Sequence, residues 1–151
     1  MGSENKKPRI FIDKKGNWFQ DGIKITHHWT YLENNRNLDN DKDGRFFVDD
    51  GYGRVYVEVE DTPFVVKMVN KIKGKLYAVL NDETVEELNP YNIKICTKNI
   101  PYTTVKDARF KARFLSQAYY EFAKYIIQQG DEFYIETPEG MIKLKRSDDL
   151  I

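Results

Sequence analysis

Three carboxylates that could act together stand close in the sequence, on Glu58, Glu60 and Asp61. Side chains two positions apart on a strand point to the same face, so Glu58 and Glu60 share one face of a predicted strand. This acidic segment could bind a ribose, a base amine or a cation, or it could be the polar face of a strand that ends in a turn. The rings of Trp18 and Phe64 are either a stacking platform beside the carboxylates or part of the hydrophobic core.

A second group that could do chemistry is a basic cluster with interleaved aromatic residues. It comprises Lys106, Arg109, Lys111 and Arg113, with Tyr102 and Phe110 interleaved. On a helix, Arg109 and Arg113 are i,i+4 neighbours, so the cluster could hold a phosphate. A solvated helix face is the alternative. The sequence contains no glycine-rich phosphate-binding loop.

A run of alternating carboxylates resembles the first half of a calcium-binding loop. Asp39, Asp41 and Asp43 precede Gly44, and Asp50 occupies the twelfth position. Hard oxygen ligands at this spacing suit Ca²⁺, which makes calcium the alternative cofactor. However, Asp at the twelfth position is shorter than the usual bidentate Glu, and a predicted strand follows instead of a helix. The default interpretation is therefore an acidic solvated turn without metal.

The histidines and the cysteine do not indicate a catalytic centre. His27 and His28 are adjacent, so on a helix they point about 100° apart and do not easily share a metal. Cys96 has no base near it in the sequence that would activate the thiol. We expect His27 and His28 at the surface near a helix start, and Cys96 as a small buried or half-buried residue.

The overall composition limits the classes of protein to consider. The 151 residues include 24 Lys and Arg and 24 Asp and Glu, so the net charge is zero. A neutral chain has no global attraction for nucleic acid or for an anionic membrane. No apolar run approaches the ~20 residues of a membrane helix, and the polar N-terminus has no signal-peptide pattern. We therefore expect a cytoplasmic protein with neither nucleic acid nor membrane as partner.

Hydrophobic alternation and turn residues predict short antiparallel strands, because the connections are too short for parallel crossovers. A short helix is predicted over 26–38. An apolar stripe of helical period predicts a long helix over 108–129, which Gly130 ends and in which Phe122 and Ile126 lie buried under a sheet. The predicted strands are 10–12, 18–19, 23–25, 46–48, 55–59, 64–69, 76–80, 93–97, 102–106, 133–135 and 141–144.

A weak internal repeat relates two parts of the chain. Residues 46–48, followed by a turn to Gly53 and a returning strand, resemble residues 133–135, followed by a turn to Gly140. A predicted helix precedes each hairpin. The pattern indicates a duplication, and the alternation common to all hairpins is the competing explanation.

Several motifs stand in a characteristic order. The most distinctive is Val59-Glu60-Asp61-Thr62-Pro63-Phe64; the others are Gly16…Trp18…Gly22, Ile25, Asp43-Gly44-Arg45-Phe46, Leu80-Asn81, Asn89-Pro90, residues 101–107 and Tyr119-Tyr120. Over nearly the whole chain this order resembles a bacterial family, the domain of unknown function 1285. The resemblance implies a duplicated core whose C-terminal half is like a pleckstrin-homology barrel. It also implies a ligand pocket at the interface of the halves, a nucleotide-like ligand and a signalling role.

These observations predict an α+β protein with a duplicated core of antiparallel strands and helices. An N-terminal α+β half is expected over 9–61, and a C-terminal barrel-like half with the long helix over 62–146. The predicted function is that of a small-ligand-binding regulatory protein without catalysis, whose pocket uses the acidic segment and the basic cluster. Two alternatives stay open. One is an enzyme acting on a nucleotide-like substrate, with the acidic segment as acid, base or metal ligand, and the other is a calcium-stabilised structural module.

Overall fold

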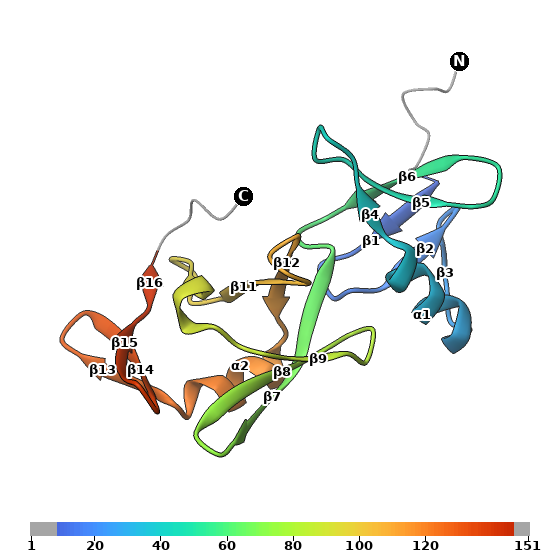
Figure 1. Cartoon of the computed structure of the whole chain (residues 1–151). Helices are drawn as coiled ribbons and strands as arrows, with labels where there is room; N and C mark the ends of the chain where they lie inside the picture. The colour runs from blue at the N-terminus through green and yellow to red at the C-terminus, as the bar shows by residue number, and fades with distance from the viewer. Residues whose placement is uncertain (1–8, 147–151) are drawn as a thin grey trace. The chain divides into compact units, whose positions relative to one another are not determined.

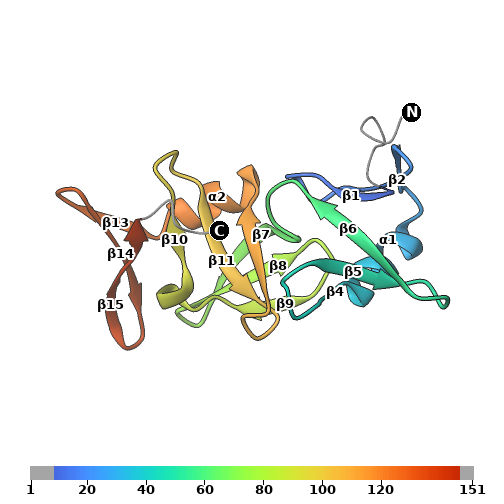
Figure 2. The same cartoon turned by 90° about the horizontal axis from the view of Figure 1, so that it is seen from above.

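The computed structural model describes residues 9–146, and Figures 1 and 2 show it from two sides. The chain divides into two compact units, of which unit 1 ends at Asp61 and unit 2 begins at Thr62. The polar segment that precedes Arg9 lies outside the described residues. Within residues 9–146 neither helix has the length and the apolar surface to cross a membrane.

Unit 1 consists of a six-stranded mixed sheet and one helix. The strand order is β3-β2-β1-β6-β5-β4. Strand β1 pairs in parallel with β6, and the other neighbours are antiparallel. A parallel pair needs a long connection, which here runs through β2, β3, α1, β4 and β5. The elements are β1 (Ile10–Ile12), β2 (Trp18–Gln20), β3 (Ile23–Lys24), α1 (His28–Asn37), β4 (Asp39–Asn40), β5 (Phe46–Asp49) and β6 (Arg54–Val59).

Trp18 joins the helix of unit 1 to its sheet. The side chain is fully buried, and its indole N–H donates to Asn35 Oδ1 at 3.1 Å. The Asn35 amide donates in turn to the Tyr31 carbonyl at 2.9 Å. The helix begins after His27, whose Nδ1 accepts the Thr30 backbone N–H. The predicted short helix is therefore present, and His27 caps its first turn.

Unit 2 contains a seven-stranded mixed sheet, one helix and a separate three-stranded sheet, which Figure 2 shows following the helix. The large sheet has the order β16-β10-β11-β12-β7-β8-β9, and the small antiparallel sheet has the order β13-β14-β15. The elements are β7 (Phe64–Ile72), β8 (Lys75–Leu80), β9 (Val85–Glu87), the short 3₁₀ helix η2 (Pro90–Asn92), β10 (Lys94–Ile95), β11 (Pro101–Val105), β12 (Phe110–Phe114), α2 (Ser116–Ala123), β13 (Ile126–Gln129), β14 (Glu132–Thr137), β15 (Gly140–Lys143) and β16 (Lys145–Arg146).

One face of the large sheet and the helix α2 form the core of unit 2. On β12, Phe110 and Phe114 are buried, whereas Lys111 and Arg113 lie on the other face. Helix α2 lies along β7 (Figure 1) and buries Phe122, whose ring meets that of Phe114 edge to face at 5.1 Å between centroids. The predicted burial of Phe122 is confirmed.

The predicted long helix over 108–129 is wrong. Residues 110–114 form β12, because their strict two-residue alternation allows pairing with β11 on one side and β7 on the other. Only Ser116–Ala123 is helical. Ile126–Gln129 forms β13, so Ile126 is half-buried in a strand opposite β14. Gly130 lies in the β13–β14 turn with φ of +64° and ends no helix.

Two further features of the expected fold need correction. The seven-stranded sheet is open, since β16 and β9 stand at its two ends, so the described part of unit 2 is no closed barrel. The sheets are mixed and not purely antiparallel, because β1 pairs with β6, β7 with β12 and β10 with β16 in parallel. Each of these pairs joins strands that are separated by several other elements. The fold is mostly β, with two short helices.

Candidate functional site

The acidic segment belongs to unit 1, where Glu60 has a structural contact. Its Oε1 accepts the Lys14 backbone N–H at 3.0 Å, and its own N–H donates to the Ile12 carbonyl at 2.8 Å. Glu60 therefore fastens the end of β6 to the chain that leaves β1. The Glu58 carboxylate is exposed and forms no hydrogen bond or ion pair with any residue in 9–146. Asp61 is half-buried at the end of the segment.

The aromatic residues proposed as a stacking platform lie in the cores of the two units. Trp18 is 0% exposed in unit 1, and Phe64 is 1% exposed in unit 2. The Phe64 ring packs against Phe110 at 5.3 Å between centroids, and the Lys106 ammonium lies 5.3 Å from its centre. Neither ring has a face open to a ligand, so the core alternative holds for both.

The residues of the basic cluster do not converge on one point. Tyr102 and Arg113 are cross-strand partners on β11 and β12, on the outer face of the large sheet. Tyr102 lines a shallow hollow of about 40 Å³ together with Lys111. Arg109 is exposed in the β11–β12 turn, with its guanidinium 5.0 Å from the centre of the Phe110 ring. This hollow is far smaller than typical ligand pockets.

Lys106 forms a short ion pair within unit 2. Its ammonium lies 2.6 Å from Asp82 Oδ2 and 3.0 Å from Thr84 Oγ1. Burial of Asp82 works against ionisation, but hydrogen bonds from Lys106 and Thr84 outweigh it, so the Asp82 pKa lies below its usual value. The Lys106 backbone N–H also donates to Glu86. Lys106 therefore fixes the turn between β11 and β12 to the β8–β9 turn.

Two carboxylates of the calcium-like loop, on Asp41 and Asp50, serve as turn acceptors. Asp41 Oδ1 accepts the backbone N–H groups of Asp43 and Arg45, and Asp41 Oδ2 accepts the Tyr56 hydroxyl. The Arg45 N–H bond is the largest influence on the Asp41 carboxyl and holds its pKa below the ordinary value. Asp50 likewise accepts a backbone N–H, from the second residue after it. Within residues 9–146, no three or more His, Cys, Asp or Glu side chains are placed to hold a metal ion.

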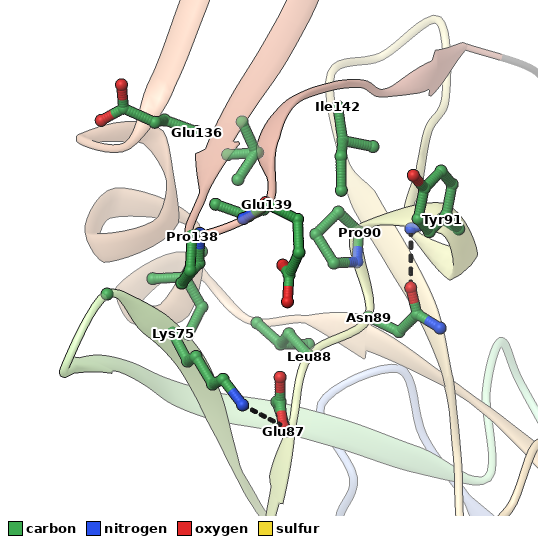
Figure 3. Close-up of a pocket in the computed structure, with 14 residues that line it drawn as sticks. Lys75, Glu87, Leu88, Asn89, Pro90, Tyr91, Glu136, Pro138, Glu139 and Ile142 are labelled. Atoms are coloured by element: carbon green, nitrogen blue, oxygen red, sulfur yellow. Dashed lines mark hydrogen bonds and ion pairs between the residues drawn. The ribbon is translucent and has the colours of Figure 1, made fainter.

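Unit 2 contains a groove that the sequence does not predict. It has a volume of about 500 Å³ and is shown in Figure 3. It is formed by the β7–β8 turn, the chain from β9 to η2, and the β14–β15 hairpin. The lining residues are Gly74, Lys75, Leu76, Glu87, Leu88, Asn89, Pro90, Tyr91, Ile135, Glu136, Thr137, Pro138, Glu139 and Ile142.

The groove combines apolar walls with carboxylates. Leu88 is buried at its floor, and Pro90 of η2 and Ile142 of β15 also line it (Figure 3). Lys75 and Glu87 form a long ion pair of 3.9 Å at its edge. Asn89 Oδ1 accepts the Tyr91 N–H, which starts the 3₁₀ turn beside the groove. The turn-forming residues are visible in the sequence, but nothing in the sequence indicates that these turns meet.

Comparisons with known proteins place the chain among proteins without an assigned function. A model of the family described as "Protein of unknown function (DUF2946)" matches residues 9–99. No curated protein matches the chain.

Solved structures share the fold. The chain is similar to a DUF1285 family protein from Silicibacter pomeroyi, with a TM-score of 0.72 and 18% identity, over 91% of this chain and 79% of that chain. It is also similar to a DUF1285 family protein from Shewanella baltica, with a TM-score of 0.62 and 18% identity, over 79% of this chain and 93% of that chain. The resemblance to this family that the sequence motifs indicate is therefore confirmed at the level of the fold.

Proposed function

We propose that this chain, which belongs to the DUF2946 family of proteins of unknown function, is a small-ligand-binding regulatory protein without catalysis. The observation that carries the proposal is the groove of about 500 Å³ in unit 2. Pockets for small molecules typically have volumes of about 300–1,000 Å³ and mostly apolar walls with a few polar groups. The groove has a volume in this range, and its lining combines the apolar residues Leu88, Pro90 and Ile142 with charged residues that include Lys75 and Glu139.

The chemistry of the lining favours binding over catalysis. The groove is lined by no His, Cys or Ser side chain. The Thr137 hydroxyl donates to the Gly140 carbonyl at 2.8 Å and accepts the Glu139 backbone N–H at 3.2 Å, so it serves the hairpin turn. A nucleophile would need a base within hydrogen-bond reach, and Thr137 has none. The alternative is an enzyme that uses the acidic segment as acid, base or metal ligand. Glu60 does not support it, because its carboxylate accepts the Lys14 backbone N–H.

The ligand site and the ligand chemistry implied by the family resemblance stay predictions. These are a pocket at the interface of the halves, a nucleotide-like ligand and a signalling role. The fold is consistent with the implied duplication, since α1 is followed by the antiparallel strands β4-β5-β6 and α2 by β13-β14-β15. We propose that these two segments are the repeated element.

A thermal-shift screen tests the proposal. The chain is incubated with nucleotides, amines, sugars and amino acids, and the melting temperature is recorded. A ligand present at about 100 times its Kd adds about 2.7 kcal/mol of stability. The groove-filling variant Ile142→Trp should abolish the shift, whereas Ile127→Trp, on the same small sheet but outside the groove lining, should retain it. A ligand whose shift survives Ile142→Trp would contradict the groove as the site.

A further inference from the structure

We infer that the groove of unit 2 takes a ligand with a cationic group, an ammonium or a guanidinium, carried on an apolar body. The inference rests on the proposed function and assigns the chemical class of its ligand. It follows from the directions of the charged side chains around the groove and from the apolar surface beneath them.

The Glu139 side chain points into the groove. Figure 3 shows it extending between Pro138 and Pro90 toward Glu87, whereas the Glu136 side chain points away from the cavity. Within residues 9–146, the Glu139 carboxylate accepts no hydrogen bond and forms no ion pair. A carboxylate in this position is available to a cation that enters the groove.

The other charges of the lining also favour a cation. Lys75 is the one basic residue of the lining, which also includes Glu87, Glu136 and Glu139. Of these three carboxylates, that of Glu136 points away from the cavity. Its ammonium lies 3.9 Å from Glu87, and both side chains of this pair are about half exposed, at 46% and 52%. Such a long, exposed pair is weak. Lys75 and Glu87 neutralise each other in this pair, so the negative charge of Glu139 is left in the groove. This charge would repel a phosphate or a carboxylate ligand.

The turn that carries Glu139 is held in place before a ligand binds. Thr137 Oγ1 accepts the Glu139 N–H at 3.2 Å and donates to the Gly140 carbonyl at 2.8 Å. The Pro138 ring packs against Gly74, where an added Cβ would lie 3.4 Å from the ring carbon Cγ. Because the hairpin and the β7–β8 turn support each other, the backbone of Glu139 needs little reordering, which favours binding.

The walls of the groove accept the apolar part of such a ligand. Leu76 and Leu88 are 6% and 5% exposed, and Ile135 is 1% exposed. These three side chains are largely covered by the protein, so the accessible apolar surface of the groove comes from the half-buried Pro90 and Ile142. A small hydrated cation would gain nothing from these walls, whereas an aromatic or aliphatic amine would bury its body there.

Two probes with the same body and opposite charge test the inference. Tryptamine carries an ammonium, and indole-3-propionate carries a carboxylate, each on an indole with a two-carbon arm. We expect tryptamine to bind more tightly by titration calorimetry and to shift the amide NMR signals of Gly74, Leu88 and Glu139. Glu139→Gln should weaken tryptamine by about two- to fivefold, as expected for an exposed ion pair. Glu136→Gln, whose side chain points away, is the matched control and should leave tryptamine binding unchanged.

Two further variants sharpen the test. Lys75→Gln removes the competing ammonium and should strengthen tryptamine binding, and Glu139→Lys should reverse the preference in favour of indole-3-propionate. Equal binding of both probes, abolished by Ile142→Trp, would overturn the cationic class and leave the ligand-binding groove intact. If neither probe shifts the groove signals at millimolar concentration, both the class and the groove are overturned.

Discussion

The ammonium of Lys106 lies 2.6 Å from Asp82 Oδ2 and thereby joins the β11–β12 turn to the β8–β9 turn. Asp82 is 1% exposed as a residue, whereas the Lys106 side chain is 26% exposed. The two partners therefore differ in what their loss would leave behind. Without Lys106 a carboxylate stays buried without its cation, whereas without Asp82 the lysine can turn toward water.

The two single substitutions should reflect this asymmetry. Lys106→Met should cost about 3–5 kcal/mol of unfolding free energy, because it leaves a buried charge uncompensated. Asp82→Asn should cost less, about 1.5–3 kcal/mol, the range for hydrogen bonds to charged groups. Urea denaturation of both variants near neutral pH measures the difference. Equal costs would mean that Asp82 reaches solvent when its partner is removed.

The same pair predicts how stability depends on pH. The Asp82 pKa is lowered in the folded state from the ordinary value of 3.8. The contribution of the ionised carboxylate is therefore complete above about pH 3.8, and it is lost as the pH falls through the lower folded-state pKa. Acid titration of stability should show this loss in the wild type and a smaller loss in Asp82→Asn. If the unfolding free energy falls equally with pH in both proteins, Asp82 does not contribute in this way.

The β11–β12 turn contains three successive residues with positive φ. Lys106, Asp107 and Ala108 have φ of 56°, 58° and 64°. This region costs a residue with a Cβ about 1–2 kcal/mol, whereas glycine adopts it without strain. Ala108→Gly should therefore raise the unfolding free energy by up to about 1 kcal/mol, after the added entropy of the unfolded chain. The matched control Ala118→Gly, in the buried face of α2, should lower it.

The core of unit 2 gives a fourth stability prediction. Phe122 is 0% exposed and packs against Phe114, so Phe122→Ala should cost about 3–5 kcal/mol. Tyr120 lies on the same helix and is 71% exposed, so Tyr120→Ala should stay within about 0.5 kcal/mol of wild type. Denaturation midpoints with unchanged slopes would measure both. A small loss in Phe122→Ala would mean that α2 does not cover β7 in solution.

Most of the longer strands and the first helix follow from the sequence, but the short strands β4, β9 and β16 and the region from Phe110 to Gln129 do not. The apolar residues Phe114, Ala118 and Phe122 fit a helical stripe, and Phe110, Ala112 and Phe114 fit a strand equally well. The pairing of β12 between β11 and β7 decides in favour of the strand. That pairing joins residues that are distant in the sequence, which local periodicity does not report.

The groove could not be predicted from the sequence, because it also depends on contacts between residues that are distant in the chain. Gly74, Asn89-Pro90 and Pro138-Glu139-Gly140 are each recognisable as turn signals. A turn signal predicts where the chain reverses, but it does not predict which other turn lies beside it. The acidic segment shows the reverse error. Its residue types suggest a ligand site, but in the structure the Glu60 carboxylate accepts a backbone N–H.

The calcium-like loop should not respond to calcium. Asp41 already accepts two backbone N–H groups and the Tyr56 hydroxyl, so its oxygens are committed to the turn. We expect equal melting temperatures with millimolar Ca²⁺ and with excess chelator. Asp41→Ala should lower the melting temperature in both conditions, because the turn loses its acceptor. A rise of several degrees with Ca²⁺ that Asp41→Ala removes would establish the loop as a metal site.

Substitutions of Glu60, which accepts the Lys14 backbone N–H, can distinguish a structural role of the acidic segment from a ligand-binding role. The bond requires an acceptor oxygen at Oε1 and no negative charge. Glu60→Gln keeps the oxygen, so it should leave the stability nearly unchanged. Glu60→Ala removes the acceptor and should cost about 0.5–1.5 kcal/mol, the net value of one hydrogen bond.

Glu58→Gln is the matched control, because the Glu58 carboxylate has no partner within residues 9–146. If Glu60→Gln or Glu58→Gln instead abolishes the stabilisation given by a ligand from the thermal-shift screen, with the stability of the unliganded protein unchanged, the charge of this segment binds that ligand.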